Sequence, residues 1–376
     1  MSTKKRFLVI SHVTETYGGL TFAFLNHLKK FYRDFDYMLH PLAETAVRES
    51  IFVSVSGDKN VRVYRKEYHA PATTSSYVSH LVISLIWLLK NDVHYEFCFG
   101  FNNLNTFVGL LLRMMHRVDV VVYYTVDYSP TRFKNRWLNR AYHLLDGFCV
   151  RHSDYVFSVS ERTRSVRRAQ GLPESKNILQ PNGVELEHIR CHEDKIPKTI
   201  FYVGHLTKSK GVDLVIKAIK TLDDSEVKFF IYGDGPYKGE LIQLTVDLGL
   251  TEQVFFLGGK DNSEILREIG KYQIGVAFYT SNDDFNFYCD PVKVKEYLAV
   301  GCPVIMSDIP EIAGAVEKEK MGIVIRNNDV TAIADGIRRL LHDRKLYDAA
   351  VKRGLEFAES YDWDLLFANS LKMVMA

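Results

Sequence analysis

Short hydrophobic runs alternate with amphipathic stretches along the C-terminal half of the chain. The hydrophobic runs predict buried β-strands at 200–203, 227–232, 254–257, 274–279, 303–306 and 322–325. Most of the intervals between them have helical periodicity, as in 212–221 and 237–248. Strands that alternate with helices predict a parallel sheet with helices on both faces.

The N-terminal half begins with the same pattern. A strand is predicted at 6–13, followed by a Gly-Gly turn and a helix at 20–32, with further buried strands at 118–125 and 155–160. The polar stretch 188–199 contains a proline and marks a domain boundary. We therefore predict two doubly wound α/β domains, 1–190 and 196–358. Two such domains that face each other leave a ligand-binding cleft at the carboxyl ends of their strands.

Composition narrows the class of protein. The 376 residues are 47% hydrophobic and 25% charged, which is typical of a globular chain with two domains. Five cysteines without C-x-x-C spacing and thirteen histidines without H-E-x-x-H argue against a disulfide framework and a zinc site. The N-terminus lacks a secretory segment, and the most apolar helix candidate, 77–89, is too short to span a bilayer. We expect a cytoplasmic protein that is not integral to the membrane.

Charge is distributed unevenly, although the net charge is only +2. Residues 1–190 contain 25 Lys and Arg against 17 Asp and Glu, whereas residues 191–376 contain 23 against 29. Basic and aromatic residues are interleaved at 132–140, and a further basic stretch lies at 162–168. A surface at 132–168 can contact an anionic membrane, although a solvated basic face explains the same pattern. No recognised nucleic-acid-binding motif accompanies the charge, so we expect no nucleic acid partner.

The stretch 290–308 reads D-P-V-K-V-K-E-Y-L-A-V-G-C-P-V-I-M-S-D and predicts a helix followed by a short strand. Asp290 can cap this helix, and Pro291 suits its first turn. The free N–H groups of the helix N-terminus suit a phosphate, and Lys293 and Glu296 share one face of the helix. This arrangement predicts a site for a phosphate and a ribose diol. An ordinary helix with solvated charges is the alternative.

Three loops that follow predicted strands contain residues suited to anions. Thr16-Tyr17-Gly18-Gly19-Leu20 places two glycines between a strand and a helix, so backbone N–H groups can approach an anion closely. The segment 204–213, G-H-L-T-K-S-K-G-V-D, contains three potentially cationic side chains. The segment 232–236, Y-G-D-G-P, is a strand-end turn. Structural turns and solvated lysines explain the same residues without a ligand.

One carboxylate in the first domain is a candidate for chemistry. The segment 120–130, V-V-V-Y-Y-T-V-D-Y-S-P, places Asp127 just after a buried strand, at the edge of the predicted cleft. A helix cap or a turn aspartate explains this residue equally well. His12, at the end of the first strand, is a weaker candidate, because a core histidine with satisfied hydrogen bonds explains it better.

These motifs, in this order, resemble those of the retaining glycosyltransferases of family 4, which have the GT-B fold of two facing Rossmann-like domains. G-H-L-T-K-S-K-G-V-D resembles the family's G-R-L-x-x-x-K-G-x-D, and Y-G-D-G-P resembles its G-x-G-P turn. K-E-Y-L-A-V-G-C-P-V-I resembles E-A-M-A-x-G-x-P-V-I, and D-P-V-K-V-K-E-Y is similar to the D-P-x-K-x-x-E-Y of some relatives. The resemblance implies an active site in the interdomain cleft and a C-terminal helix, about 360–376, that crosses back onto the first domain.

The resemblance also implies a role for each motif. Lys210 would neutralise the departing nucleotide diphosphate, and Asp127 would lie near the transferred sugar, so these two are the expected catalytic residues. Glu296 would accept the ribose hydroxyls. His205 stands at the family's usual arginine, and Tyr288 at its usual first glutamate. The expected donor-binding residues are Gly18, Gly19, Gly204, His205, Lys210, Gly235, Asp290, Pro291, Val292, Lys293 and Glu296.

The activity that the resemblance implies is hexosyl transfer (EC 2.4) with retention. The sugar would pass from a nucleotide sugar to a hydroxyl of a glycan or lipid-linked acceptor, in polysaccharide or glycoconjugate assembly. We expect no metal and no other cofactor, because no acidic D-x-D cluster follows a strand. The protein would work in the cytoplasm, peripheral to the inner face of the cell membrane. Two alternatives stay open: a nucleotide-sugar 2-epimerase of the same fold, and a non-catalytic GT-B subunit that binds nucleotide sugar.

Overall fold

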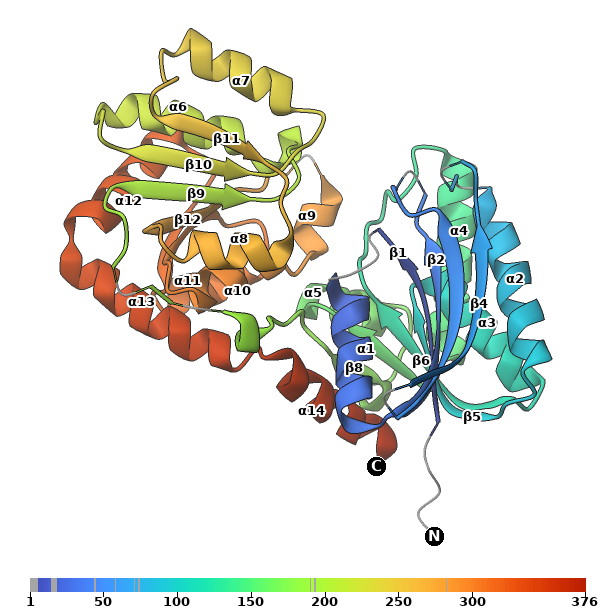
Figure 1. Ribbon diagram of the computed structural model, residues 1–376. Coiled ribbons are helices and arrows are strands. Elements are labelled where there is room, and N and C mark those ends of the chain that lie inside the picture. The colour runs from blue at the N-terminus through green and yellow to red at the C-terminus, as the bar shows by residue number, and fades with distance from the viewer. Residues whose placement is uncertain are drawn as a thin grey trace. The chain divides into compact units, whose positions relative to one another are not determined.

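The computed structural model describes residues 6–14, 19–43, 45–57, 59–70, 72–73, 75–189, 191–192, 194–281 and 283–376 (Figure 1). Contacts within the chain divide it into two compact units. Unit 1 comprises Met1–Pro181 together with Phe367–Ala376, and unit 2 comprises Asn182–Leu366. Each unit is an α/β domain with its own sheet.

Unit 1 is built on an eight-stranded sheet in the order β4-β3-β2-β1-β5-β6-β7-β8. β3 is antiparallel to its neighbours, and the other pairs of strands are parallel. The strands β2, β3 and β4 lie on one side of β1, and the later strands from β5 onward lie on its other side. The strand order therefore reverses between β1 and β5. Open α/β sheets bind ligands at such a switch point. The strands are β1 (Phe7–Val13), β2 (Asp34–Pro41), β3 (Glu49–Ser56), β4 (Lys59–Glu67), β5 (Tyr95–Phe101), β6 (Val118–Thr125), β7 (Tyr155–Ser158) and β8 (Asn177–Leu179).

Helices cover both faces of this sheet, because successive side chains of a strand point to opposite faces. Leu8 and Ile10 of β1 pack in one core with Val108 of α3. On the other face, the Phe24 ring of α1 lies 5.0 Å from the Phe367 ring of α14. Figure 1 shows α2, α3 and α4 along the first of these faces. The helices are α1 (Gly19–Phe31), α2 (Ser76–Lys90), α3 (Asn103–Met114), α4 (Arg136–His152), α5 (Glu161–Ala169) and α14 (Trp363–Met375), with a 3₁₀ turn η1 (Glu174–Lys176).

Unit 2 contains six parallel strands in the order β11-β10-β9-β12-β13-β14. All six strands predicted from the hydrophobic runs are present, and their ends differ from the prediction by at most two residues. β12 shows the largest difference, because it ends at Ala277 and leaves Phe278 and Tyr279 in the following loop. The strands are β9 (Thr199–Val203), β10 (Lys228–Tyr232), β11 (Val254–Gly258), β12 (Ile274–Ala277), β13 (Val304–Ser307) and β14 (Gly322–Ile325).

The helices of unit 2 form a layer on each face of its sheet. Ile200 packs with residues of α6 and α12 in one core, whereas its neighbour Phe201 packs with Val294 and Tyr297 of α10 in the other. The helices are α6 (Val212–Leu222), α7 (Lys238–Asp247), α8 (Asn262–Ile269), α9 (Asp284–Tyr288), α10 (Val292–Ala299), α11 (Ile312–Lys318), α12 (Val330–His342) and α13 (Arg344–Glu359), with 3₁₀ turns η2 (Leu186–His188) and η3 (Lys208–Lys210).

The division between the units lies before the expected boundary at 188–199. Asn182 already belongs to unit 2, because its backbone N–H donates to Asp290 Oδ2 (2.7 Å) and its side chain donates to the Asp290 carbonyl (2.8 Å). Val184 also belongs to unit 2, where its N–H donates a hydrogen bond to the carbonyl of Tyr361 (2.8 Å). At the C-terminus, Phe367–Ala376, which includes most of α14, belongs to unit 1.

Candidate active site

Two loops at the carboxyl ends of β9 and β10 pack against each other through glycines. Gly204 has a φ of +141° and Gly233 a φ of +138°, conformations that L side chains rarely adopt. A Cβ atom on Gly233 would overlap the carbonyl oxygen of Gly204, and one on Gly235 would overlap that of Leu206. Gly204 also faces Lys293, whose Nζ would lie 2.5 Å from an added Cβ. The backbone of Gly204, without a side chain, therefore lies beside Lys293.

Two lysines from different parts of the chain lie near one aromatic side chain. Lys210 Nζ is 4.8 Å from the centroid of the Tyr279 ring, and Lys293 Nζ is 5.9 Å from it. Lys210 also donates to Asn286 Oδ1 (2.8 Å), and Lys293 lies over the Tyr202 ring at 4.3 Å. Aromatic faces attract cations, so these rings hold both lysines near the carboxyl ends of β9 and β12.

The positions of these lysines lower their pKa values. Burial lowers the pKa of Lys210. Burial and the positive charge of Lys210 lower the pKa of Lys293 to about 7, although the Glu296 carboxylate acts in the opposite direction. An anion that binds beside both lysines relieves their mutual repulsion and raises both pKa values. The pair is therefore chemically suited to a multiply charged anion such as a diphosphate.

The N-terminus of α10 differs from the prediction. The helix begins at Val292 with Pro291 as its N-cap residue, and no side chain caps it, so the prediction that Asp290 caps the helix is wrong. Asp290 Oδ2 instead accepts hydrogen bonds from Lys295 Nζ (2.6 Å) and from the N–H of Asn182 (2.7 Å). This ion pair is almost fully buried, and a buried cation offers the carboxylate more than an N–H group of the first turn. Contact of Asp290 with a donor sugar stays a prediction.

The other predicted residues of unit 2 lie around the same helix end and the same loop. Val292 and Lys293 are the first two residues of α10, and Glu296 is one helical step from Lys293. His205 is exposed in the loop after β9, where its carbonyl accepts a hydrogen bond from Tyr202 Oη (3.2 Å). Unit 2 thus brings a half-buried carboxylate, two lysines and glycine-lined loops to one end of its sheet.

Gly19 and Asp127 belong to unit 1, and Gly18 lies outside the described residues. Gly19 has a φ of +72° at the first residue of α1, and nothing lies within 4 Å of an added Cβ. Asp127 follows β6, and its Oδ2 accepts a hydrogen bond from Arg132 (2.6 Å). Asp127 Oδ1 is buried and makes no hydrogen bond with the residues that the structure describes. The cap of α4 is Asn135, so Asp127 is not a helix cap.

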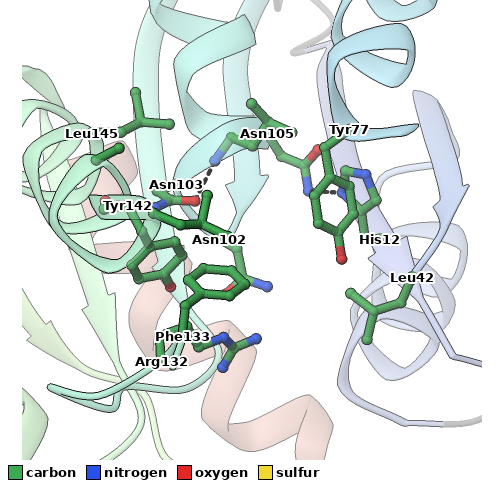
Figure 2. A pocket seen from close by; sticks show the side chains of 13 residues that line it. His12, Leu42, Tyr77, Asn102, Asn103, Asn105, Arg132, Phe133, Tyr142 and Leu145 are labelled. Atoms are coloured by element: carbon green, nitrogen blue, oxygen red, sulfur yellow. Dashed lines mark hydrogen bonds between the residues drawn. The ribbon is translucent and has the colours of Figure 1, made fainter. Parts of the chain in front are cut away.

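A cavity of about 280 Å³ opens beside Arg132 at the carboxyl ends of β1 and β5 (Figure 2). Side chains from α2, α3, α4, the loops before α3 and α4, the end of β1 and the residue after β2 form its walls. Leucines and aromatic rings dominate these walls, among them Leu42, Tyr77, Phe133 and Tyr142. The cavity therefore lies at the switch point of the sheet, where a ligand site is expected.

His12 contributes to the wall of this cavity, but its ring is fully engaged. Asn105 Nδ2 lies 3.0 Å from His12 Nδ1 and donates to it, so we assign the proton of the neutral ring to Nε2. That Nε2 lies 3.1 Å from His80 Nδ1 and donates in turn. Burial and the neighbouring His80 lower the pKa of His12 to about 3. His12 is thus a neutral core histidine with satisfied hydrogen bonds.

The basic stretch 162–168 is neutralised by acidic partners. Arg167 is buried in an ion pair with Asp146 (2.5 Å). Arg164 and Arg168 both pair with Glu174. The prediction that this stretch forms part of an open basic surface is therefore wrong for Arg167, whereas for Arg164 and Arg168, which stay partly exposed in their ion pairs, it stays a prediction. The partners are distant in sequence or lie beyond the helix, so the basic run alone does not reveal them.

Several residues that complete the site escape prediction from sequence. Tyr202 and Tyr279 support the lysines through their rings, and Asn286 accepts from Lys210. An aromatic residue at the end of a buried strand, next to a polar loop, is a signal that could have identified both tyrosines. Lys295 is next to a predicted site residue, but only the fold shows that it binds Asp290.

Among the described residues, no group of three or more His, Cys, Asp and Glu side chains is arranged to hold a metal ion. Asp283 caps α9 by accepting from the N–H of Phe285 (3.1 Å). That the protein needs no metal stays a prediction.

The C-terminal part of the chain matches a known protein family. Residues 187–357 match the family described as "Glycosyl transferases group 1". This range lies within unit 2 and includes both lysines, the glycine-lined loops and Glu296. This part of the chain is therefore similar to that family.

Curated relatives match at low identity. One is an uncharacterised glycosyltransferase of Methanocaldococcus jannaschii, 27% identical over 243 residues, which are 60% of this chain and 61% of that protein. Another is the N-acetylgalactosamine-N,N'-diacetylbacillosaminyl-diphospho-undecaprenol 4-alpha-N-acetylgalactosaminyltransferase of Campylobacter jejuni, 25% identical over 287 residues, which are 74% of this chain and 75% of that protein. The chain spans between 61% and 75% of the length of these two relatives.

Solved structures match over nearly the whole chain. HepE of Anabaena in complex with UDP is similar with a TM-score of 0.74 and 14% identity, over 98% of this chain and 99% of that one. Sucrose-phosphate synthase of Thermosynechococcus elongatus has a TM-score of 0.73 and 14% identity, over 99% and 98% of the two chains. At this identity the likeness shows the fold alone. The chain has the GT-B fold predicted from its motifs, with two α/β domains.

Proposed function

We propose that the protein is a glycosyltransferase that moves a sugar from a nucleotide sugar to a hydroxyl of a glycan or lipid-linked acceptor. The observation that carries this proposal is the pair formed by Lys210 and Lys293 beside Tyr279, within the part of the chain that is similar to glycosyl transferases group 1. Two partly desolvated cations favour the negative charge that develops on a departing nucleoside diphosphate. Glu296, on the same helix as Lys293, accepts the ribose hydroxyls in this proposal.

The class of donor and acceptor is supported by relatives. HepE of Anabaena has been solved in complex with UDP and with UDP-glucose, which favours a uridine nucleotide sugar as the first donor to test. The Campylobacter jejuni relative acts, by its name, on a diphospho-undecaprenol acceptor. We propose hexosyl transfer with retention, in the assembly of a polysaccharide or glycoconjugate, without a metal. Asp127 and Lys210 are the proposed catalytic residues.

The experiment that tests the proposal has two readouts. Thermal unfolding with UDP-, GDP- and ADP-sugars identifies the donor, because a ligand that binds only the folded state raises Tm. Incubation of that donor with and without glycan or undecaprenyl-linked acceptors then identifies the reaction. Transfer that depends on acceptor supports the proposal. An epimeric sugar formed without acceptor would indicate the 2-epimerase, and binding without turnover would indicate the non-catalytic subunit.

The affinity for a nucleoside diphosphate is predicted to fall as pH rises above 7. The free protein has a Lys293 pKa of about 7, and bound diphosphate raises that pKa. Below pH 7 the lysine is already charged, so it adds no pH dependence. Above pH 7 binding takes up a proton, and affinity falls by up to about tenfold per unit until the pH reaches the pKa of the complex. The terminal phosphate, with a pKa of about 6, is already ionised there.

Calorimetry in two buffers of different ionisation enthalpy measures this proton uptake directly. Wild-type protein should take up a fraction of a proton on binding UDP at pH 8. Lys293→Met lacks the titrating ammonium, so this contribution to the proton uptake should disappear. Lys208→Met is the control, because Lys208 is exposed in the 3₁₀ turn that also contains Lys210 and should leave the uptake unchanged. Equal uptake by wild type and Lys293→Met would remove Lys293 from the diphosphate site.

Membrane contact is a further part of the proposal. Among the described residues, no helix has both the length and the apolar character needed to cross a bilayer. Trp137 is 66% exposed at the start of α4, with the Arg136 guanidinium 5.1 Å from its ring centroid. Lys134 and Arg140 are exposed nearby, whereas Arg132 is paired with Asp127. We propose that this basic and aromatic end of α4 contacts the anionic cytoplasmic face of the membrane.

Replacing Lys134, Arg136 and Arg140 by Glu is predicted to abolish binding to anionic vesicles. Each basic side chain near an anionic surface contributes about 1 kcal/mol, and added salt weakens the attraction. The matched control reverses three exposed cations of unit 2, Lys318, Arg344 and Lys352. Vesicle flotation at low and high salt measures both variants. If both variants bind like wild type, or if wild type does not bind, the end of α4 is only a solvated face.

A further inference from the structure

One residue of the unit 1 cavity has a backbone conformation that its side chain does not favour. Asn102 has φ 70° and ψ 168°, in a region that is essentially restricted to glycine. Its backbone is held there from both sides: its N–H donates to the Tyr124 carbonyl (2.9 Å), and its carbonyl accepts from the N–H (3.1 Å) and the hydroxyl (2.8 Å) of Thr106. Strain of this kind is often found where a side chain must point at a ligand.

The side chain of Asn102 makes none of the local hydrogen bonds that could stabilise the fold at its position. It occupies the N-cap position of α3, yet it accepts no hydrogen bond from the first turn. The neighbouring Asn103 accepts from the N–H of Leu104 (2.7 Å), and Asn105 donates to His12 and to the Phe101 carbonyl. The amide of Asn102 makes no hydrogen bond with any residue that the structure describes.

This amide points into the cavity. Figure 2 shows Asn102 between the rings of Phe133 and Tyr142 on one side and the side chains of Tyr77 and Leu42 on the other. The cavity lies at the end of β1 and β5, which is the switch point of the sheet. A polar group that converges on an otherwise apolar cavity is the usual arrangement of a specific small-molecule site.

The chemistry of the walls limits the ligand. The Arg132 guanidinium is paired with Asp127, and His12 is neutral and bonded to Asn105, so these lining groups offer no uncompensated charge. An amide donates and accepts at once, so its best partner is a group that also does both, such as a secondary amide or a hydroxyl. Apolar walls favour a methyl group beside that polar group, and aromatic walls favour the flat C–H face of a ring. An acetamido sugar has all three features.

We propose that this cavity binds an N-acetylated sugar unit of the acceptor and that Asn102 recognises its acetamido group. The volume of about 280 Å³ is just below the range of small-molecule sites, which are about 300–1,000 Å³, so it suits a ligand as small as one sugar unit. Only the identification of this sugar with the acceptor rests on the proposed function. The strain at Asn102 is retained because glycine, which would relieve it, carries no amide.

Direct binding without any nucleotide sugar tests the proposal. Saturation-transfer NMR compares N-acetylglucosamine and N-acetylgalactosamine with glucose and galactose, which differ from them only in carrying a hydroxyl in place of the acetamido group. We expect wild-type protein to bind the acetylated sugars about two- to tenfold more tightly, the range of one neutral hydrogen bond. Equal binding of acetylated and unmodified sugars, no sugar binding, or displacement of the sugar by an alkyl alcohol alone would overturn the proposal.

Two variants separate recognition from structure. Asn102→Gly and Asn102→Ala should both lose the preference for acetylated sugars. Asn102→Gly should also raise Tm by a few degrees, because glycine adopts this φ and ψ freely, whereas Asn102→Ala keeps the strain and should not. A preference that persists in Asn102→Gly would overturn the role of this residue. Since donor turnover is measured separately, loss of the acetamido preference and loss of glycosyl transfer are distinguishable results.

Discussion

Replacement of Lys210 by alanine is expected to lower glycosyl transfer by about 10²–10³-fold, the cost of removing one preorganised donor to developing negative charge. Lys210 is held in place by the Tyr279 ring (4.8 Å) and by its hydrogen bond to Asn286 (2.8 Å). Burial lowers its pKa, so the ammonium is poorly hydrated before the donor binds and gains most when diphosphate charge appears beside it. The effect should fall on turnover more than on the affinity for the intact nucleotide sugar, because charge on the diphosphate grows in the transition state.

Folding should be little affected by this substitution. The Asn286 side chain loses one donor but keeps its own hydrogen bonds to the carbonyls of Ser209 (3.2 Å) and Thr280 (3.0 Å). The expected loss is about 1 kcal/mol of unfolding free energy. Lys208→Ala is the matched control: Lys208 is exposed in the same 3₁₀ turn and should keep wild-type turnover. Steady-state kinetics of both variants, with thermal unfolding to check the fold, measures the difference. Wild-type turnover in Lys210→Ala would exclude the proposed role.

The sheet of unit 2 could be predicted because its four central strands are largely buried and its edge strands, β11 and β14, are at least partly buried. Such strands appear in the sequence as short continuous hydrophobic runs, and all six are found. The edge strand β4 of unit 1 could not be recognised in this way. β4 is exposed along nearly its whole length, so Lys59–Glu67 is mainly polar and has no hydrophobic run. Antiparallel edge strands depend on pairing with a neighbour, which sequence periodicity does not report.

The candidate site shows a similar division. Local sequence placed Lys293 and Glu296 on one face at the start of a helix, because spacing along a helix fixes which residues share a face. The same local reasoning gave Asp290 a capping role, and there it was wrong. The carboxylate binds Lys295, which also donates to the Asn182 carbonyl (2.6 Å) from a segment far away in sequence. Competition between a local N–H group and a distant charged partner is decided by the fold.

Asn102 is a second residue whose role cannot be predicted from the local sequence and depends on the fold. Its sequence context, F-N-N-L-N, contains three asparagines that look equivalent. The structure distinguishes them, because Asn103 and Asn105 are hydrogen-bonded within unit 1 and Asn102 has a positive φ and no side-chain partner among the described residues. Residues that conflict with local preference are expected at functional sites, where other contacts compensate the strain.

The arginine-rich stretch of α5 contains the residue with the largest predicted effect on stability. Arg167 and Asp146 are both about 1% exposed, and the ion pair joins α5 to α4. Arg167 also donates to Thr125 Oγ1 (3.1 Å) at the end of β6, and its guanidinium lies 5.3 Å from the centroid of the Tyr123 ring. Burial raises the pKa of the Asp146 carboxyl, but the Arg167 charge and its hydrogen bonds lower it further than burial raises it. Both groups are therefore charged in the folded protein.

Arg167→Leu is expected to lower the unfolding free energy by about 3–5 kcal/mol, because it leaves the Asp146 carboxylate buried without its cation. Arg168→Leu on the same helix is the matched control. Arg168 is half-exposed and pairs with Glu174, so its loss should cost no more than about 1 kcal/mol. The double variant Asp146→Leu with Arg167→Leu should recover part of the loss, since no buried charge then remains. Urea unfolding of the full chain measures all three. If Arg167→Leu and Arg168→Leu cost the same, solvent must reach Asp146 in the folded state, and the buried pair is not what joins α4 to α5.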